Sequence, residues 1–455
     1  MQGMHLRRVP LPPTMTDAPS PPDRTAARSA YADFVPPTGL RLALALFALA
    51  LGGFGIGTTE FATMGVLPEI STDLHASIPA TGHLISLYAL GVVVGAPLLA
   101  VLGARLPRKQ LLIALMVAFV VGNLASALAP HFGVLAVARF VSGLPHGAYF
   151  GIGSVVAARL VAPERRGQAV SMMMAGLTVA NLLGVPLSTV LGQAFGWRAT
   201  YVVVTVIGLV TLLALTVWLP SVAADPSVGM RTELGGLRRP QLWLAVLTGA
   251  VGFGGFFAVY SYIAPTLTEV SGYSTGSISL ILALFGLGMT LGNLLGGRLA
   301  DWSVERTLYL GLGFLVVVLL GFTVAVHSRI AAAIGIFLLG GSGSAMIPAL
   351  QARLMDVSGE AQSLGAALNH SALNVANALG AWLGGIVIAA GFGYPSTALV
   401  GAALAVAGLV VVTVAHAMDR RSSVSPSGSA ASDYPDGSPE RAEELERTPV
   451  AFADR

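Results

Sequence analysis

Runs of about 20 apolar residues recur along this chain, and they constrain its fold more than any other feature. A helix of that length crosses the hydrocarbon core of a bilayer. We therefore expect an all-α membrane protein with twelve transmembrane helices. The predicted spans are roughly 41–67, 79–103, 110–129, 132–158, 167–192, 199–219, 241–265, 276–299, 307–326, 330–353, 362–390 and 395–417.

Composition supports this prediction. Fifty-five per cent of the residues are hydrophobic, only 10% are charged, and the mean hydropathy of +0.77 does not fit a soluble globule. The 55 glycines suit close helix packing in lipid. The absence of cysteine excludes disulfides and thiolate metal sites, and we expect neither a metal nor a cofactor. The net charge of +3 does not indicate nucleic-acid binding, because membrane topology accounts for the basic residues.

The distribution of lysine and arginine predicts the orientation, since cytoplasmic loops retain positive charge. If the N-terminus is cytoplasmic and the spans alternate, 22 of the 25 basic residues lie in cytoplasmic segments. Only Arg198 and Arg329 lie outside, and Arg139 lies within a span. We therefore expect a multi-pass protein of the cell (inner) membrane with both termini in the cytoplasm.

The chain divides by composition into two apolar blocks and three polar segments. Residues 1–40 and 418–455 are predicted to be disordered cytoplasmic tails. The first apolar run starts too late and is too long for a secretory signal peptide. A polar cytoplasmic linker, residues 220–240, separates an N-terminal six-helix bundle, 41–219, from a C-terminal six-helix bundle, 241–417.

The two blocks repeat one another at an offset of 196–197 residues. The motif Gly91-x-x-x-Gly95 recurs as Gly288-x-x-x-Gly292, and Val179-Ala-Asn181-Leu-Leu-Gly184 recurs as Val375-Ala-Asn377-Ala-Leu-Gly380. Six spans return the chain to the side on which it started, so the repeats run parallel. This predicts two bundles around a central cavity, with transport by rocking one against the other.

Glu60 and Arg139 depart from this repeat. Glu60 lies inside the first predicted span, and its counterpart is Phe257; the counterpart of Arg139 lies near Ile336. Charges within a membrane span are costly and mark functional sites by default. Helix packing common to both halves needs neither charge, so function is favoured over structure.

Several motifs resemble the major facilitator superfamily, in particular the drug:proton antiporters near bacterial arabinose-efflux and chloramphenicol-resistance permeases. The resemblance covers about 41–417. Thr58-Thr-Glu60-Phe and Val66-Leu-Pro68 resemble the first helix of that branch, and Arg139-Phe-Val-Ser-Gly143-Leu-Pro-His146-Gly resembles its fourth-helix motif, which the family links to proton coupling. Asn181-Leu-Leu-Gly184-Val-Pro186 resembles the fifth-helix antiporter motif.

The loop between the second and third spans departs from the family pattern. Ala104 and Pro107 stand where the family usually has aspartate and glycine, whereas the second copy keeps Gly297 and Asp301. The charge-relay role that the family assigns to the aspartate is therefore not supported in the first half. Arg105, Arg108 and Lys109 remain candidates for clamping helix ends or anionic lipid. In the second copy of the motif, Arg306 is the last basic residue after Asp301.

Glu60 and Arg139 sit at a similar predicted depth, and we expect an ion pair or a water-linked pair. Such a pair is either part of proton coupling or a fixed structural contact. A carboxyl group exposed in turn to each side of the membrane can bind a proton outside and release it inside. His146 lies one heptad after Arg139 and is a candidate relay, with a core histidine bonded to a backbone carbonyl as the alternative.

Candidate substrate-binding residues come from aromatic and polar positions within the spans. The aromatic candidates suit an apolar cavity, although each also fits ordinary core packing. They are Phe54, Tyr149, Phe257 and Tyr260. His370 and Asn374 lie on one stripe with Asn377 and are polar candidates. Because Asn181 and Asn377 are related by the repeat, we favour helix packing for those two.

We interpret the chain as a proton-coupled exporter of a small, hydrophobic compound such as a drug or a sugar-like molecule. Its partners are the substrate, protons and lipid, and we expect a monomer. Proton-coupled uptake of a sugar or similar nutrient is an alternative, although the spans hold few carboxylates and amides for it. A membrane receptor or an intramembrane enzyme is a third. The enzyme needs a nucleophile with a base, a carboxylate pair or a metal cluster, which one glutamate and scattered histidines do not supply.

Overall fold

The computed structural model describes residues 36–103, 106–162, 165–222, 235–359 and 361–424, and every regular element in those ranges is a helix. The described part of the first half contains eight α-helices and one π-helix. They are α2 (Gly39–Gly65), α3 (Leu67–Asp73), α4 (Ile78–Leu102), α5 (Arg108–Ala127), α6 (Phe132–Arg159), α7 (Arg166–Val179), the π-helix η2 (Ala180–Gly184), α8 (Val185–Phe195) and α9 (Arg198–Trp218).

The described part of the second half begins with several short helices and ends with five long ones. The short elements are α11 (Pro240–Gly252), α12 (Gly254–Tyr260), α13 (Ile263–Pro265), the π-helix η3 (Thr266–Val270) and the 3₁₀-helix η4 (Thr275–Ser277). The long ones are α14 (Ile278–Trp302), α15 (Val304–Ala325), α16 (Arg329–Ser358), α17 (Gln362–Ala389) and α18 (Ser396–Val424).

Eleven helical segments among the described residues are long and apolar enough to cross a membrane. The expected fourth span, 132–158, corresponds to helix α6 but is not among the eleven. Arg139, Pro145 and His146 lower the hydropathy of α6. The least apolar of the long predicted spans is therefore the one that carries Arg139 and His146, two of the three candidates for proton coupling.

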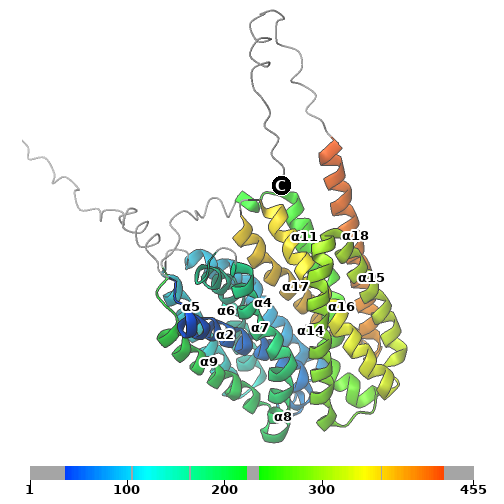
Figure 1. The fold of residues 1–455 in the computed structure, drawn as a ribbon. Coiled ribbons are helices and arrows are strands. Elements are labelled where there is room, and N and C mark those ends of the chain that lie inside the picture. Colours follow the sequence, from blue (N-terminus) through cyan, green and yellow to red (C-terminus); the bar gives the residue numbers. More distant parts are fainter. Residues whose placement is uncertain (1–35, 104–105, 163–164, 223–234, 360, 425–455) are drawn as a thin grey trace, which may run out of the picture. The chain divides into compact units, whose positions relative to one another are not determined.

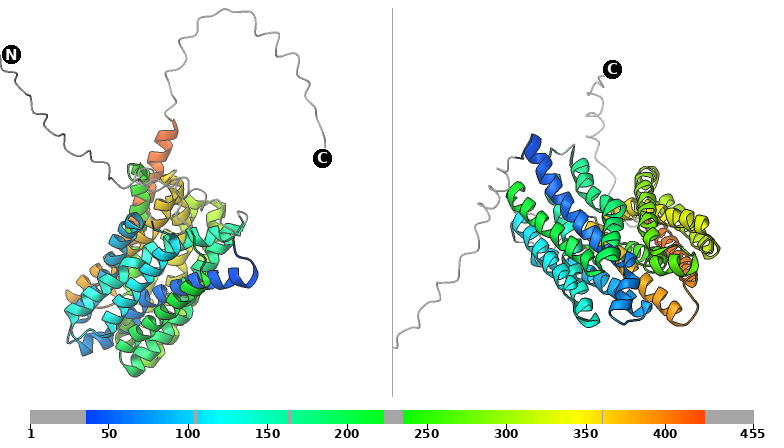
Figure 2. Two further views of the ribbon diagram at one scale, coloured as in Figure 1. Left: turned by 90° about the vertical axis from the view of Figure 1, so that its left-hand side faces the viewer. Right: turned by 90° about the horizontal axis from the view of Figure 1, so that it is seen from below.

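Two groups of helices lie side by side within the compact unit that ends at Val412 (Figures 1 and 2). Helices α2 to α9 form one group, and the helices from α11 onward form the other. Buried apolar side chains follow this division: two clusters come from the first group. The largest cluster comes mostly from the second, with contributions from α2, α4 and α8. The prediction of a twelve-helix fold built from two six-helix bundles is confirmed.

The sequence repeat is also a repeat of close helix contacts. A Cβ atom on Gly91 would lie 2.2 Å from the carbonyl oxygen of Phe140, and one on Gly288 would lie 2.2 Å from that of Phe337. Both pairs are separated by 197 positions, and the next turn repeats the relation with Gly95 on Leu144 and Gly292 on Gly341. In both halves a glycine ridge lets α4 approach α6, and α14 approach α16, at backbone distance.

The most extensive contacts between the two groups are those of α4 with α17 and of α14 with η2 and α8. Ser86 on α4 donates a hydrogen bond to the carbonyl of Ala378 on α17, at 3.1 Å. Gly286 on α14 lies against the backbone of Asn181 in η2. The two interfaces are themselves related by the repeat, because α14 is the counterpart of α4 and α17 is the counterpart of η2 with α8.

The remaining predictions concern the ends and the linker. A second compact unit begins at Thr413, and its described part is the end of α18, which continues to Val424 rather than ending near residue 417. Most of the predicted tails, 1–40 and 418–455, and of the linker, 220–240, lies outside the described residues. The boundaries of the two bundles therefore stay predictions.

Candidate functional site

Glu60 lies near the carboxyl end of α2, in a stretch where every residue from Gly55 to Gly65 is buried. Its side chain is 6% exposed. The small residues that precede it allow neighbouring helices to approach. A Cβ atom on Gly57 would lie 2.9 Å from the Cβ of Ala180, and one on Gly184 would meet the hydroxyl of Thr58. Glu60 is thus a carboxyl group enclosed by protein at the junction of α2 with η2.

Arg139 is fully buried and is anchored to the residue before Glu60. Its Nη1 donates to Oγ1 of Thr59 at 3.0 Å, and its Nη2 donates to the carbonyl of Thr59 at 3.1 Å. The Thr59 hydroxyl donates in turn to Oδ1 of Asn123 on α5, at 2.6 Å. The guanidinium also lies 4.3 Å from the centre of the Tyr88 ring, a cation–π contact.

The expected direct ion pair between Glu60 and Arg139 is not formed. Among the described residues, the basic group within 4.0 Å of Glu60 is His146, whose Nε2 lies 4.0 Å from Oε2 of the carboxyl group. The planar guanidinium is already held by Thr59, so the charge of Arg139 is fixed beside α2 without touching the acid. The sequence predicted that the two charges lie at one depth. It could not predict that the guanidinium of Arg139 would donate its hydrogen bonds to Thr59 instead of Glu60.

His146 connects the two charges through Tyr88. The Tyr88 hydroxyl lies 3.0 Å from Nδ1 of His146, while the other ring nitrogen faces Glu60. Both side chains are 1% exposed. His146 is therefore bonded to a side chain, not to a backbone carbonyl, and Tyr88 links it to Arg139.

The second group of helices closes over this cluster with aromatic rings and one histidine. His370 on α17 stacks on Phe150 with ring centres 5.0 Å apart, and its ring lies 5.9 Å from that of His146. Beside Glu60, Phe61 stacks on Phe257 at 6.4 Å and meets the edge of Tyr260 at 5.7 Å. Three substrate candidates, His370, Phe257 and Tyr260, thus lie beside the charged residues across the junction of the two groups.

The equivalent place in the second half contains no charge. The counterparts of Thr59, Glu60, Tyr88 and Arg139 are Phe256, Phe257, Phe285 and Ile336. Phe256 packs on Phe257 at 4.9 Å and on Phe285 at 5.4 Å, and Ile336 is fully buried. The same scaffold therefore holds a polar network in one half and an aromatic cluster in the other.

The antiporter-like motif forms a π-helix. Asn181 and Gly184 lie in η2, and Pro186 lies in the first turn of α8. The Asn181 amide donates to the carbonyl of Leu177 at 3.0 Å, but its Oδ1 is buried without a partner. A π-helix inside an α-helix often marks a functional site. Here it lies between α2 and α14 and faces the helix that carries Glu60.

Helix α17 carries buried polar groups without partners. Asn374 donates to the carbonyl of His370 at 3.0 Å, yet its Oδ1 is unpaired. Asn377 is fully buried, and neither atom of its amide has a hydrogen-bond partner. Buried polar groups almost always have partners, so this stripe fits a surface that binds water or substrate.

The other two aromatic candidates contact protein elsewhere. The Tyr149 hydroxyl donates to the carbonyl of Leu49 at 3.1 Å, and the ring is fully buried against Gly52. Phe54 is partly exposed and packs against Gly184. Tyr149 therefore joins α6 to α2, while Phe54 retains an accessible face.

The loop motifs hold helix ends. Lys109 donates to the carbonyl of Thr216 at 2.8 Å, and the backbone N–H of Arg108 donates to the carbonyl of Val222. Arg306, in the first turn of α15, lies over the ring of Trp302, 4.9 Å from its centre, and Asp301 and Trp302 are the last residues of α14. Arg105 lies outside the described residues. Lys109 thus contacts the last turn of α9, and the clamping role of this loop stays a prediction.

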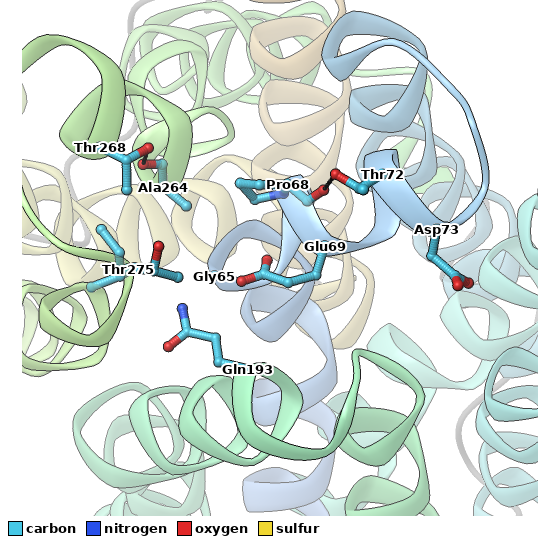
Figure 3. A pocket seen from close by; sticks show the side chains of 10 residues that line it. Gly65, Pro68, Glu69, Thr72, Asp73, Gln193, Ala264, Thr268 and Thr275 are labelled. Carbon is cyan, nitrogen blue, oxygen red and sulfur yellow. Dashed lines mark hydrogen bonds between the residues drawn. The ribbon is translucent and has the colours of Figure 1, made fainter.

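A second partly buried acid, Glu69 on α3, went unrecognised in the sequence. It lines a cavity of about 390 Å³ between α2, α3 and α8 of the first group and α13, η3, η4 and α14 of the second. Glu69 and Gln193 point into this cavity, with Thr268 and Thr275 on the opposite wall (Figure 3). Oε2 of Glu69 and Nε2 of Gln193 are buried without hydrogen-bond partners. The pair Leu67-Pro68 before Glu69 is typical of a span end, so the sequence did not predict that Glu69 is partly buried.

Comparison with known proteins identifies the fold. The family model described as Major Facilitator Superfamily matches residues 49–328 and 258–451. The chain belongs to the major facilitator superfamily. Members of this superfamily with curated descriptions include the inner membrane transport protein YdhP of Escherichia coli (strain K12), which is 43% identical over 81% of this chain and 94% of its own length. The chloramphenicol resistance protein of Streptomyces lividans is 32% identical over 74% of this chain and 87% of its own.

A solved structure agrees on the fold. The bacterial homologue of the human lysosomal transporter Spinster, in an inward-facing and unoccupied conformation, matches with a TM-score of 0.65 and 18% identity. The match covers 84% of this chain and 96% of that one. This major facilitator chain is thus a transporter and not an enzyme, and the resemblance to the chloramphenicol-resistance branch is confirmed.

Proposed function

We propose that the chain exports small, moderately hydrophobic compounds in exchange for protons by alternating access. The observation that carries the proposal is the buried carboxyl of Glu60. It lies beside His146 and near Arg139, at the junction where the two groups of helices meet. Movement of one group against the other would open this junction to each side of the membrane in turn.

Proton binding at Glu60 would change the charge of the junction. An ionised carboxylate attracts the fixed charge of Arg139 and binds water or a polar ligand, whereas the neutral acid is compatible with an apolar, closed junction. If substrate and proton favour opposite states, the inward proton gradient drives the substrate out. Such coupling requires that each ligand bind the two conformations with different affinity.

The lining of the junction supports an apolar substrate with few polar groups. Phe257, Tyr260 and Phe150 supply aromatic faces, and His370 and Asn374 supply hydrogen-bonding groups from α17. Aromatic walls with a few placed polar groups are typical of small-molecule sites. The similarity to a protein named for chloramphenicol resistance agrees with this class of substrate.

The first test is substrate accumulation in cells that express the wild type or Glu60→Gln, with chloramphenicol and arabinose as probes. The wild type should lower the accumulation of the apolar probe, and an uncoupler should abolish this effect. Glu60→Gln keeps the size of the side chain but cannot release a proton. It should lose at least about 90% of uncoupler-sensitive export, because the proposed exchange requires a side chain at this position that can both bind and release a proton.

Glu269→Gln is the matched control, because Glu269 is exposed in η3 and far in sequence from the cluster. It should export as the wild type does. Full uncoupler-sensitive export by Glu60→Gln would remove Glu60 from the mechanism. Proton-driven accumulation of arabinose inside cells would instead favour the alternative, uptake by symport.

A further inference from the structure

Tyr88 contacts two residues of the charged cluster formed by Glu60, Arg139 and His146, although none of the sequence motifs described above contains it. It lies on α4, between the guanidinium of Arg139 on one side of its ring and the imidazole of His146 at its hydroxyl. It is 1% exposed, so its hydroxyl must find its partner within the protein. The Nδ1 of His146, at 3.0 Å, is that partner.

The direction of this hydrogen bond follows from the opposite side of the imidazole. Nε2 of His146 faces the carboxyl of Glu60 at 4.0 Å. An ionised carboxylate only accepts hydrogen bonds, and a neutral histidine carries one proton, on one of its two nitrogens. The arrangement is consistent when Nε2 carries the proton, so Nδ1 accepts and the Tyr88 hydroxyl donates. A movement of about 1 Å would bring Nε2–H into hydrogen-bond range of Glu60.

The second half shows that packing does not need the hydroxyl. The counterpart of Tyr88 is Phe285, also fully buried. Gly143 approaches the carbonyl of Tyr88, and Gly340 approaches that of Phe285, in equivalent contacts between equivalent helices. The chain therefore already builds this helix pair around a phenylalanine. The additional oxygen of Tyr88 occurs only in the half that carries Glu60, Arg139 and His146.

We propose that Tyr88 is a positioning residue that holds His146 in the tautomer with Nε2–H directed at Glu60. The inference rests on the proposed proton-coupled function. By fixing the donor toward the carboxylate, Tyr88 favours the charged form of the acid and sets the pH at which the site takes up a proton. The cation–π contact with Arg139 holds the ring in place while the helices move.

The tautomer can be measured on the wild type without any substrate. The purified full-length protein in lipid vesicles, labelled with ¹⁵N-histidine, should give a His146 signal with an unprotonated, hydrogen-bonded Nδ1 and a protonated Nε2 at neutral pH. The signal is assigned by its loss in His146→Gln. A proton on Nδ1 in the wild type would overturn the proposal without need of any Tyr88 variant.

The second experiment measures proton binding by Glu60 in the Tyr88→Phe variant. Infrared titration follows the carboxyl band that is absent from Glu60→Gln. In Tyr88→Phe the midpoint of this band should move by about one pH unit toward alkaline values, because a hydrogen bond to a charged group corresponds to about a tenfold change in proton affinity or more. His146 should show a mixture of tautomers in the same sample.

Tyr262→Phe is the matched control. It also removes a buried tyrosine hydroxyl, which donates to the carbonyl of Ala381 at 2.6 Å and lies against Gly82 and Gly385 rather than against the charged residues. It should leave the midpoint unchanged. An unchanged midpoint in Tyr88→Phe overturns the positioning role, even if Glu60→Gln abolishes export. Uncoupler-sensitive export by Glu60→Gln overturns the proposed function instead, whatever Tyr88→Phe does to the titration.

Discussion

Neutral neighbours hold Arg139, one of the charged residues of the site, in position through hydrogen bonds. Arg139 is bonded to the hydroxyl and carbonyl of Thr59, and Thr59 is bonded to Asn123. The sequence identified Glu60, Arg139 and His146, because charge within an apolar run is conspicuous. It did not identify Thr59, Asn123 or the hydrogen bond of Tyr88, since threonine, asparagine and tyrosine are common in helices and their partners are chosen by tertiary packing.

Glu69 gives a prediction at this scale, because it lies beyond the membrane-spanning part of α2. Burial raises the pKa of its carboxyl group above the usual range, and its own backbone N–H offsets part of the rise. An acid whose pKa is raised by folding holds its proton more tightly in the folded state. The wild type therefore loses stability as pH rises above the ordinary carboxyl pKa, until the folded pKa is reached.

Glu69→Gln cannot ionise, so it should unfold at a higher temperature than the wild type at neutral pH. The difference should shrink as the pH falls toward the ordinary carboxyl range, where both side chains are neutral. Thermal unfolding of both proteins across a pH series measures this. A difference of constant size at every pH would show that the ionisation of Glu69 does not oppose folding.

At the scale of elements, glycine ridges set the distance between helices. The apolar runs predicted the spans, and the recurring Gly-x-x-x-Gly motif predicted their repeat, because both follow from the sequence itself. The π-helix at Ala180–Gly184 was not predicted, although its motif was recognised. An extra residue in a helical turn is stabilised by contacts with α2 and α14, which the periodicity of one segment does not contain.

Two glycines of α14 allow a matched test of the ridge. In Gly288→Ala the new methyl group would lie 2.2 Å from the carbonyl oxygen of Phe337, whereas at Gly297 nothing lies within 4 Å. Overpacking of this kind costs about 1–3 kcal/mol, and an unobstructed glycine-to-alanine change in a helix gains up to about 1 kcal/mol. Gly288→Ala should therefore lower the unfolding temperature in detergent, and Gly297→Ala should keep or raise it. Equal effects would mean that α14 and α16 do not pack at backbone distance.

For the whole molecule, the repeat establishes two similar bundles, and the basic residues supply the orientation. We propose that both termini are cytoplasmic, because 22 of 25 basic residues then lie on that side. The cysteine-free sequence makes this measurable with single cysteines. Ala162, between α6 and α7, and His327, between α15 and α16, are both exposed.

A membrane-impermeant maleimide should label His327→Cys in intact cells and Ala162→Cys only after permeabilisation. The cysteine-free wild type shows the background of the reaction. The reverse pattern would invert the orientation, and with it the direction in which a proton gradient drives the substrate.

The low hydropathy of α6 has a consequence for how the chain is made. A helix with a central arginine partitions poorly into lipid on its own. Thr59 and Tyr88, which solvate the guanidinium, precede it in the chain and leave the ribosome first. We therefore expect α6 to insert by docking against helices that are already in the bilayer. The order of synthesis then lowers the free-energy cost of burying Arg139.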